Sequence, residues 1–282
     1  MAIRIVTDST ADLPKEAREA WGILTAPMGV VFENRLYLQD IDMSLEEFYD
    51  RLSAAKEIPS TTQVNPETFV EVFAPVVEAG DQVLAICVSS GLSSTHQCAA
   101  IAAESFPPNS VFVVDTRNVT IGAALLVARA VEMREAGAPI EEIARELQDM
   151  GRRVVMYAVI NDLSYPHKGG RLPTVGLHVL GVLDIKPIVS IWNGVANSVG
   201  LARGMRGAYR WIAERAAKEG IDERYGVAFG HTNAPELMPL LEATVFPKGT
   251  ELKVLRHPVG MVLGAHAGPG SVAMAYIKKE KA

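Results

Sequence analysis

Strand-like apolar segments alternate with helix-like segments through the first half of the chain, and this alternation constrains the fold more than any other feature. Segment 82–88 is almost continuously apolar, as is typical of a strand buried on both faces of a parallel sheet. Good capping residues, Asp12 and Ser44, precede two of the helices. Alternating strands and helices predict an α/β domain with a mostly parallel sheet. The expected strands are 3–7, 23–25, 30–38, 82–88 and 111–114, and the expected helices are 12–21, 45–52, 66–79, 95–104, 120–135 and 140–150.

The pattern changes after Met150, where strands outnumber helices. A mixed sheet covered by a few helices is the expected architecture of this part, in two α/β layers. The chain has 282 residues, which is enough for two domains of roughly 100–200 residues. We therefore predict a Rossmann-like domain over 1–150 and a mixed-sheet domain over 151–282. The expected strands are 154–160, 185–191, 226–229, 252–255 and 272–276, and the expected helices are 205–219 and 235–246.

Charge balance and cysteine content argue against several classes of protein. A formal net charge of −6 argues against general binding to nucleic acid, which leaves a basic footprint. The longest apolar runs, such as 121–128, are much shorter than the roughly 20 residues that cross a bilayer. Segment 1–6 reads directly as a strand rather than as a signal peptide. Cys87 and Cys98 form no disulfide framework and suit a reducing compartment. We therefore expect a cytoplasmic protein without a membrane span.

A hydroxyl-rich turn, 89–95, follows the predicted strand 82–88 and leads into a helix. In doubly wound α/β domains, ligands bind beyond the carboxyl ends of the strands, and the first N–H groups of a helix attract anions. Ser93 and the N–H groups after it thus form a candidate anion seat. Ser94 with Gln97 also matches a capping box. An anion seat and a simple helix cap explain this turn equally well.

His266 is the most informative single residue, because it lies in the glycine-rich segment 264–270, where backbone can approach a ligand closely. Histidine near neutral pH can donate to an anion or exchange a proton, and a structural hydrogen-bonding role is an equal alternative. Turn 60–62 carries three hydroxyl groups, but no strand precedes it, so a plain loop explains it. Turn 8–10 follows the first predicted strand and is expected on the same rim as the serines, as a loop with an Asx-type turn.

A basic segment with two glycines, 167–171, is the last candidate. Arg171 is suited to pair with a carboxylate or phosphate through two parallel hydrogen bonds, and a solvated turn is the alternative. Sequence templates of known chemistry are missing: there is no G-x-S-x-G elbow, no P-loop, no G-x-G-x-x-G after the first strand, no H-E-x-x-H and no C-x-x-C. We therefore predict no metal and no cofactor.

Six segments in order along the chain resemble motifs of the DegV family, the fatty-acid-binding proteins of bacteria. Each motif is weak alone, whereas six in the right order over nearly the whole chain are specific. The resemblance implies a DegV-like fold, with an N-terminal three-layer α/β/α domain and a C-terminal two-layer α/β domain with a mixed sheet. The segments are Val6-Thr7-Asp8-Ser9-Thr10-Ala11-Asp12-Leu13, Pro59-Ser60-Thr61-Thr62-Gln63, Ser89-Ser90-Gly91-Leu92-Ser93-Ser94-Thr95, Lys168-Gly169-Gly170-Arg171, Asp184-Ile185-Lys186-Pro187-Ile188 and Gly264-Ala265-His266-Ala267-Gly268-Pro269-Gly270.

The resemblance also implies a function. It implies one long-chain fatty acid in an apolar tunnel, with its carboxylate held between the domains, in a carrier protein that is not itself an enzyme. It further implies that a separate fatty acid kinase phosphorylates the bound carboxylate from ATP to form an acyl phosphate. The implied carboxylate-binding residues are Thr61, Thr62, Ser93, Ser94 and His266, and the implied kinase-facing residues are Lys168, Arg171 and Arg203.

Two other functions stay open at this stage. One is a serine hydrolase or acyltransferase that uses Ser93 with His266. The missing elbow and the lack of an obvious orienting carboxylate count against it. The other is the substrate-binding subunit of a triose or sugar kinase, because dihydroxyacetone kinase domains look distantly similar and hold their substrate on a histidine.

Overall fold

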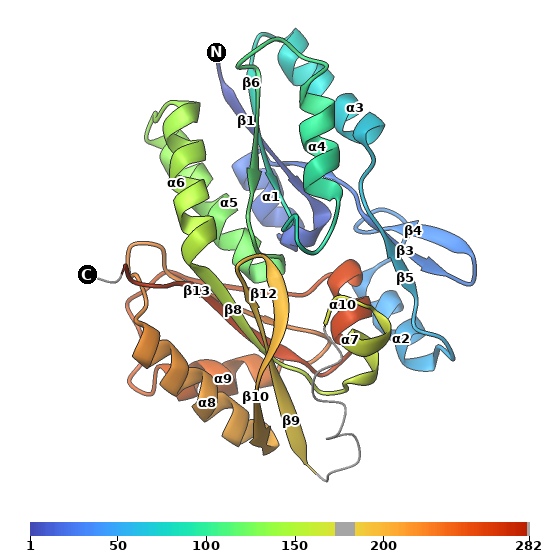
Figure 1. The fold of residues 1–282 in the computed structure, drawn as a ribbon, viewed down its shortest axis with the longest axis vertical. Coiled ribbons are helices and arrows are strands. Elements are labelled where there is room, and N and C mark those ends of the chain that lie inside the picture. Colours follow the sequence, from blue (N-terminus) through green and yellow to red (C-terminus); the bar gives the residue numbers. More distant parts are fainter. Residues whose placement is uncertain (173–183, 281–282) are drawn as a thin grey trace.

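The first half of the chain forms a wholly parallel sheet between two helical layers (Figure 1). The structure is a computed structural model that describes residues 1–172 and 184–280, and it describes His167 and Lys168 by their backbone only. The strand order is β2-β1-β6-β7. Helices α3 and α4 pack on one face, and α5 and α6 pack on the other. The three-layer α/β/α prediction is therefore confirmed. These elements are β1 (Ile3–Asp8), β2 (Leu24–Ala26), β6 (Gln82–Cys87), β7 (Val111–Asp115), α1 (Lys15–Trp21), α3 (Pro66–Glu78), α4 (Thr95–Ala103), α5 (Thr120–Glu135) and α6 (Ile140–Arg153).

The second half forms a mixed sheet of order β10-β9-β8-β13-β11-β12, in which only β11 and β12 run parallel to each other. Helices α8 and α9 cover one face of it, and α5 contacts β8, β11 and β13. The predicted mixed sheet is confirmed. These elements are β8 (Val154–Val159), β9 (Ile185–Trp192), β10 (Val195–Arg203), β11 (Val227–His231), β12 (Val254–Pro258), β13 (Val272–Ile277), α8 (Gly204–Glu219) and α9 (Leu237–Val245).

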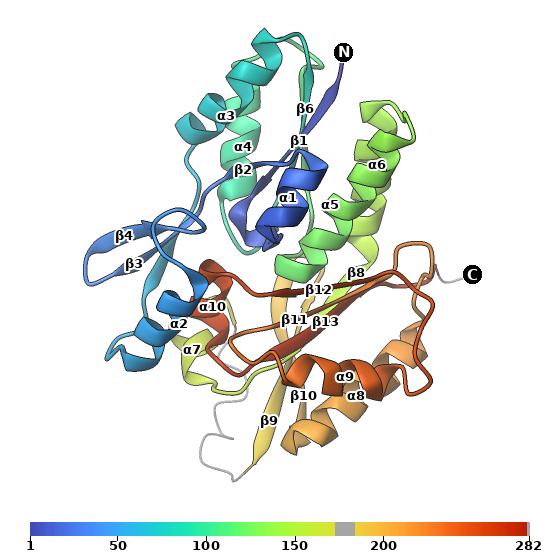
Figure 2. The same ribbon diagram turned by 180° about the vertical axis from the view of Figure 1, so that it is seen from behind.

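A third, small antiparallel sheet lies beside the other two and was not predicted as a sheet (Figure 2). Its strands follow the order β4-β3-β5, and helix α10 packs against β3, β5, α2 and α7. The turn at Glu33 and Asn34, both with positive φ, joins β3 to β4 as the sequence predicts. These elements are β3 (Gly29–Phe32), β4 (Arg35–Leu38), β5 (Ser60–Thr62), α2 (Leu45–Ala54), α7 (Ser164–Lys168) and α10 (Met261–Ala267).

Helix α5 ties the two larger sheets together, because it contacts β1 and β6 of one and β8, β11 and β13 of the other. Its side chains are buried almost throughout, which explains why its sequence carries little amphipathic pattern. Helix α6 runs past residue 150 to Arg153, where β8 begins at once. The division into domains 1–150 and 151–282 stays a prediction. No helix in the described residues is both long and apolar enough to span a membrane.

Two local predictions were wrong and one helix was missed, and each case has a physical reason. Asp12 does not cap α1: it adopts a left-handed conformation, is buried, and accepts a hydrogen bond from Gln39 Nε2 at 2.9 Å. Turn 60–62 is not a loop, since it is strand β5 and gains its partner from β3. Helix α10 was not predicted, because Gly264 at its centre reads as a loop residue. A Cβ on Gly264 would lie 2.7 Å from Tyr49 Oη, so close packing with α2 requires the glycine.

Candidate functional site

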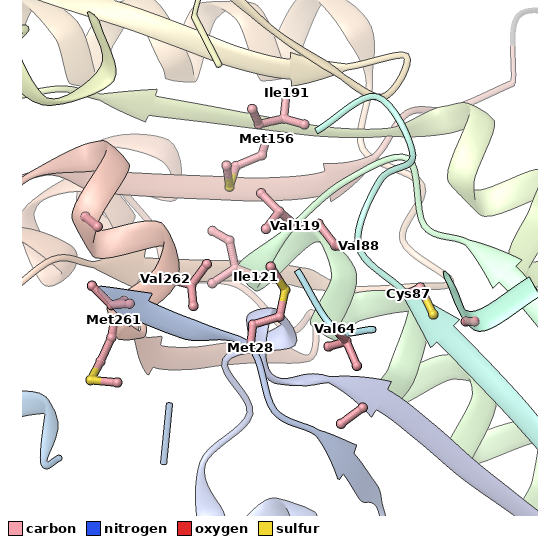
Figure 3. Packing of buried hydrophobic residues seen from close by; sticks show 14 of the residues in the cluster. Met28, Val64, Cys87, Val88, Val119, Ile121, Met156, Ile191, Met261 and Val262 are labelled. Carbon is pink, nitrogen blue, oxygen red and sulfur yellow. The ribbon is translucent and has the colours of Figure 1, made fainter. Parts of the chain in front are cut away.

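An apolar cavity of about 430 Å³ lies where α10 and β5 meet the two larger sheets. Its volume is within the range of roughly 300–1,000 Å³ typical of small-molecule pockets. Figure 3 shows Met156, Val119, Ile121, Val262 and Met28 gathered around this region, from β8, α5, α10 and the segments that precede α5 and β3. The principal apolar side chains that line the cavity are Met28, Val88, Val119, Met156, Ile160, Val189, Ile191 and Val262.

One wall of the cavity carries a group of polar side chains, the polar seat, which consists of Thr61, Thr62, Ser93, Ser94 and His266. Thr61 on β5 and His266 in the last turn of α10 are joined by a hydrogen bond of 3.0 Å between Thr61 Oγ1 and His266 Nε2. Thr62, Ser93 and Ser94 line the same cavity, so the structure brings all five predicted carboxylate-binding residues to one site. Short hydroxyl groups beside an imidazole can donate several hydrogen bonds to one carboxylate. Their binding role stays a prediction.

His266 is neutral in this environment. Burial, together with the nearby positive charge of Arg171, lowers the pKa of His266 to about 4. Its Nδ1 is buried and has no hydrogen-bond partner among the described residues. This atom faces the backbone of Gly169, where a Cβ would collide with it. Backbone therefore approaches the ring closely on the Gly169 side, although the ring itself belongs to helix α10.

The serine turn caps α4, but with a different serine from the one predicted. Ser93 Oγ accepts from Thr95 N–H at 3.3 Å and shares a hydrogen bond with Thr95 Oγ1 at 2.9 Å. Ser94 is the N-cap by backbone conformation, yet its side chain makes no capping bond, so the predicted Ser94–Gln97 capping box was wrong. Ser93 thus combines a capping role with a place on the cavity wall.

The basic residues predicted to face a partner lie in different places. Arg171 is exposed and lines the cavity, where Nη1 donates to Gly169 O at 3.0 Å. Arg203 is exposed at the end of β10 and does not line the cavity. The Lys168 side chain lies outside the described atoms. Of the described candidates, Arg171 is therefore the one that acts on the polar side chains of the cavity, because its charge affects the pKa of His266.

A catalytic serine arrangement is not found among the described residues. The hydroxyl of Ser93 pairs with Thr95, while His266 pairs with Thr61. His266 Nδ1 has no carboxylate partner to orient the ring. A nucleophile, a base and an orienting group must contact one another in sequence for this chemistry. The hydrolase alternative therefore has no supporting geometry, and no group of three His, Cys, Asp or Glu side chains in the described part of the chain is placed to hold a metal.

Two buried polar residues, Asp8 and Gln39, hold the rim of the site, and the sequence pointed only to the first of them. Asp8 accepts from Val88 N–H at 2.6 Å and from Thr10 N–H at 3.0 Å, which ties the end of β1 to β6 and gives the expected Asx-type turn. Gln39 donates to Ser9 O at 2.7 Å and accepts from Val262 N–H at 3.0 Å, so it fixes the start of α10. A single glutamine after a strand gives no sequence signal for this role.

Comparisons with known proteins agree with this architecture. A family model described as "Uncharacterised protein, DegV family" matches residues 2–279. A DegV domain-containing protein of Caldanaerobacter subterraneus is 33% identical over 279 residues, which cover 98% of this chain and 99% of that protein. A solved DegV family protein of Thermus thermophilus, described by its fatty acid binding, matches with a TM-score of 0.88 at 29% identity, over 99% of this chain and 100% of that one. DegV of Bacillus subtilis, described as a fatty acid binding protein, matches with a TM-score of 0.86 at 28% identity, again over 99% and 100%.

Proposed function

Because the chain belongs to the DegV family, we propose that it binds one long-chain fatty acid in the cavity, with the carboxylate held by Thr61, Ser93 and His266. The observation that carries this proposal is a large apolar cavity with one polar seat, built around the 3.0 Å contact of Thr61 and His266. An acyl chain matches the apolar walls, and each buried CH₂ contributes about 0.8 kcal/mol. The solved relatives named for fatty acid binding support the same ligand.

A neutral His266 suits a carrier that must also release its ligand. At neutral pH the Nε2–H of the neutral imidazole can donate to Thr61 Oγ1, which leaves the Thr61 hydroxyl proton to donate to a carboxylate. Arg171 adds positive potential without a direct ion pair to any described carboxylate. The seat therefore binds through dipoles and a nearby charge. A bound carboxylate would in turn favour protonation of His266.

We propose further that the protein presents the carboxylate to a separate cytoplasmic kinase. In that reaction a carboxylate oxygen attacks the γ-phosphorus of ATP, the bond to the bridging oxygen breaks, and ADP leaves. The protein's own part is to hold the carboxylate in line, and a misplacement of about 1 Å can cost roughly 10²-fold in rate. The exposed guanidinium of Arg171, beside the cavity, supports a role at the surface that meets the kinase.

Displacement of a fluorescent fatty acid tests the binding proposal. Thr61→Val removes one donor but keeps the side-chain shape, and we expect it to weaken binding by about 1 kcal/mol, or roughly fivefold. Thr68→Val is a matched control, because Thr68 lies in the first turn of α3 and does not line the cavity. Equal affinities of the wild type and the Thr61 variant would remove Thr61 from the seat, and no displacement from the wild type would refute fatty acid binding.

A further inference from the structure

His231 brings a second hydrogen-bond donor to the cavity, away from the carboxylate seat. It ends β11 and lines the cavity. Its Nδ1 accepts a hydrogen bond from Ala234 N–H at 3.1 Å, which requires a lone pair on that nitrogen. Burial lowers the pKa of His231 and favours the neutral ring. The ring proton is therefore on Nε2, and this N–H has no acceptor among the described residues.

Thr120 presents a second polar group to the same cavity. It is fully buried, lines the cavity, and its Oγ1 has no hydrogen-bond partner of good geometry in the described chain. Its φ of 46° is unusual for a β-branched residue, and strain of this kind persists where the surrounding structure enforces it, often at ligand sites. The Thr120 hydroxyl interacts with the Asp12 carboxyl and by hydrogen bonding lowers the pKa of Asp12, against the larger opposing effect of burial.

The two groups come from touching segments. Gly230, which precedes His231, packs so closely on Ile121, which follows Thr120, that a Cβ on Gly230 would lie 2.8 Å from Ile121 Cγ2. This region joins the start of α10, because Val259 N–H donates to His231 O at 2.9 Å. His266 lies at the other end of α10, five residues after Met261, which corresponds to roughly 7–8 Å along the helix axis.

Other polar side chains in this part of the cavity already have protein partners. Thr232 Oγ1 accepts from Ser271 N–H at 2.8 Å, Ser271 Oγ donates to Ala267 O at 3.1 Å, and Thr10 Oγ1 donates to Asp8. A plain acyl chain at this place would leave the Nε2–H of His231 unpaired and would give the Thr120 hydroxyl only the Asp12 carboxyl as a partner. Burying an unpaired donor is unfavourable, whereas a ligand hydroxyl could accept from His231 and donate to Thr120.

We infer that His231 and Thr120 form a second polar site in the cavity, which binds a hydroxyl group carried part-way along an acyl chain. This inference rests on the proposed function, because it takes the carboxylate to lie at Thr61 and His266. Because His231 meets the segment just before α10 and His266 lies in the last turn of that helix, the second site lies well beyond the carbon next to the carboxylate. A site built to bind a hydroxyl group discriminates against the ligand that lacks it.

Two substitutions of His231 separate its two nitrogens. His231→Asn places an oxygen where Nδ1 lies, so it can keep the bond from Ala234 N–H while removing the Nε2 donor. His231→Gln places an amide N–H near the Nε2 position. Octadecanoic acid and 10-hydroxyoctadecanoic acid compete with a fluorescent fatty acid on each protein. 2-Hydroxyoctadecanoic acid serves as the control for a hydroxyl group next to the carboxylate.

The wild type is expected to favour 10-hydroxyoctadecanoic acid over octadecanoic acid. That preference should fall about three- to tenfold in His231→Asn, the loss of one hydrogen bond, and return in part in His231→Gln. Thr120→Val should lower the same ratio, and Thr120→Ser should retain it. An equal change for both acids in His231→Asn would overturn the inference while leaving fatty acid binding intact. Failure of both acids to displace the probe from the wild type would refute the proposed function itself.

Discussion

Thr61 Oγ1 and His266 Nε2 lie 3.0 Å apart and join β5 to α10 across 205 positions of the chain. The contact closes the polar wall of the cavity, because both β5 and α10 contribute residues to its lining. It also explains why two unrelated sequence signals, a hydroxyl-rich turn and a glycine-rich segment, belong to one site.

Gly169 is expected to control the position of His266. Gly169→Ala would place a methyl group against His266 Nδ1 and displace the ring from Thr61. We expect fatty acid affinity to fall by about 1 kcal/mol, or roughly fivefold. Gly170→Ala is the control: its φ of 67° strains any side chain, but a Cβ there meets no atom within 4 Å. If both variants lose the same affinity, strain in the loop, and not contact with His266, accounts for the loss.

Ser93 and Ser94 should differ in their effect on stability. Ser93→Ala removes the oxygen that accepts from Thr95 N–H, and the loss of a helix cap costs about 0.5–2 kcal/mol. Ser94→Ala removes a side chain without a capping bond, and we expect a change within about 0.5 kcal/mol. Urea unfolding of the two variants measures the difference. The cap assignment is wrong if Ser94→Ala proves the more destabilised of the two.

Much of this could be predicted from the sequence, where local patterns and packing agree. Helix α5 begins and ends at the predicted residues, Thr120 and Glu135, and the serine turn lies on the cavity as expected. The third sheet could not be predicted, because strand β5 has only three residues and depends on pairing with β3. Helix α10 was missed for a similar reason: contact with Tyr49 requires Gly264, which overrides helix propensity.

Asp12 should make the protein less stable as the pH rises. Burial raises the pKa of Asp12 from 3.8 to about 7. Between pH 3.8 and pH 7, Asp12 is therefore protonated in the folded state and ionised in the unfolded state. Its contribution to stability is therefore greatest below pH 3.8 and falls as the pH rises through 7. Asp12→Asn carries no such proton and can still accept from Gln39. The melting temperature of the variant minus that of the wild type should increase from pH 5 to pH 8, and a constant difference would refute the shifted pKa.

Arg171 is expected to hold the pKa of His266 down. Its positive charge adds to the larger effect of burial, so Arg171→Ala should raise the pKa of His266 from about 4 toward the ordinary value of 6.5. An NMR titration of the His266 ring measures the change. Arg203→Ala is the control, because Arg203 is exposed and lies outside the cavity lining. An unchanged pKa in Arg171→Ala would show that the guanidinium lies too far from the seat to act on a ligand.

The identity of the bound molecule tests the central claim most directly. Extraction of the purified protein with organic solvent, followed by mass spectrometry, measures which molecule occupies the cavity and in what amount. We predict about one equivalent of a long-chain fatty acid per protein, held by an apolar cavity with a single carboxylate seat. An empty protein that also fails to take up added fatty acid, or one that carries a polar metabolite instead, would contradict the account.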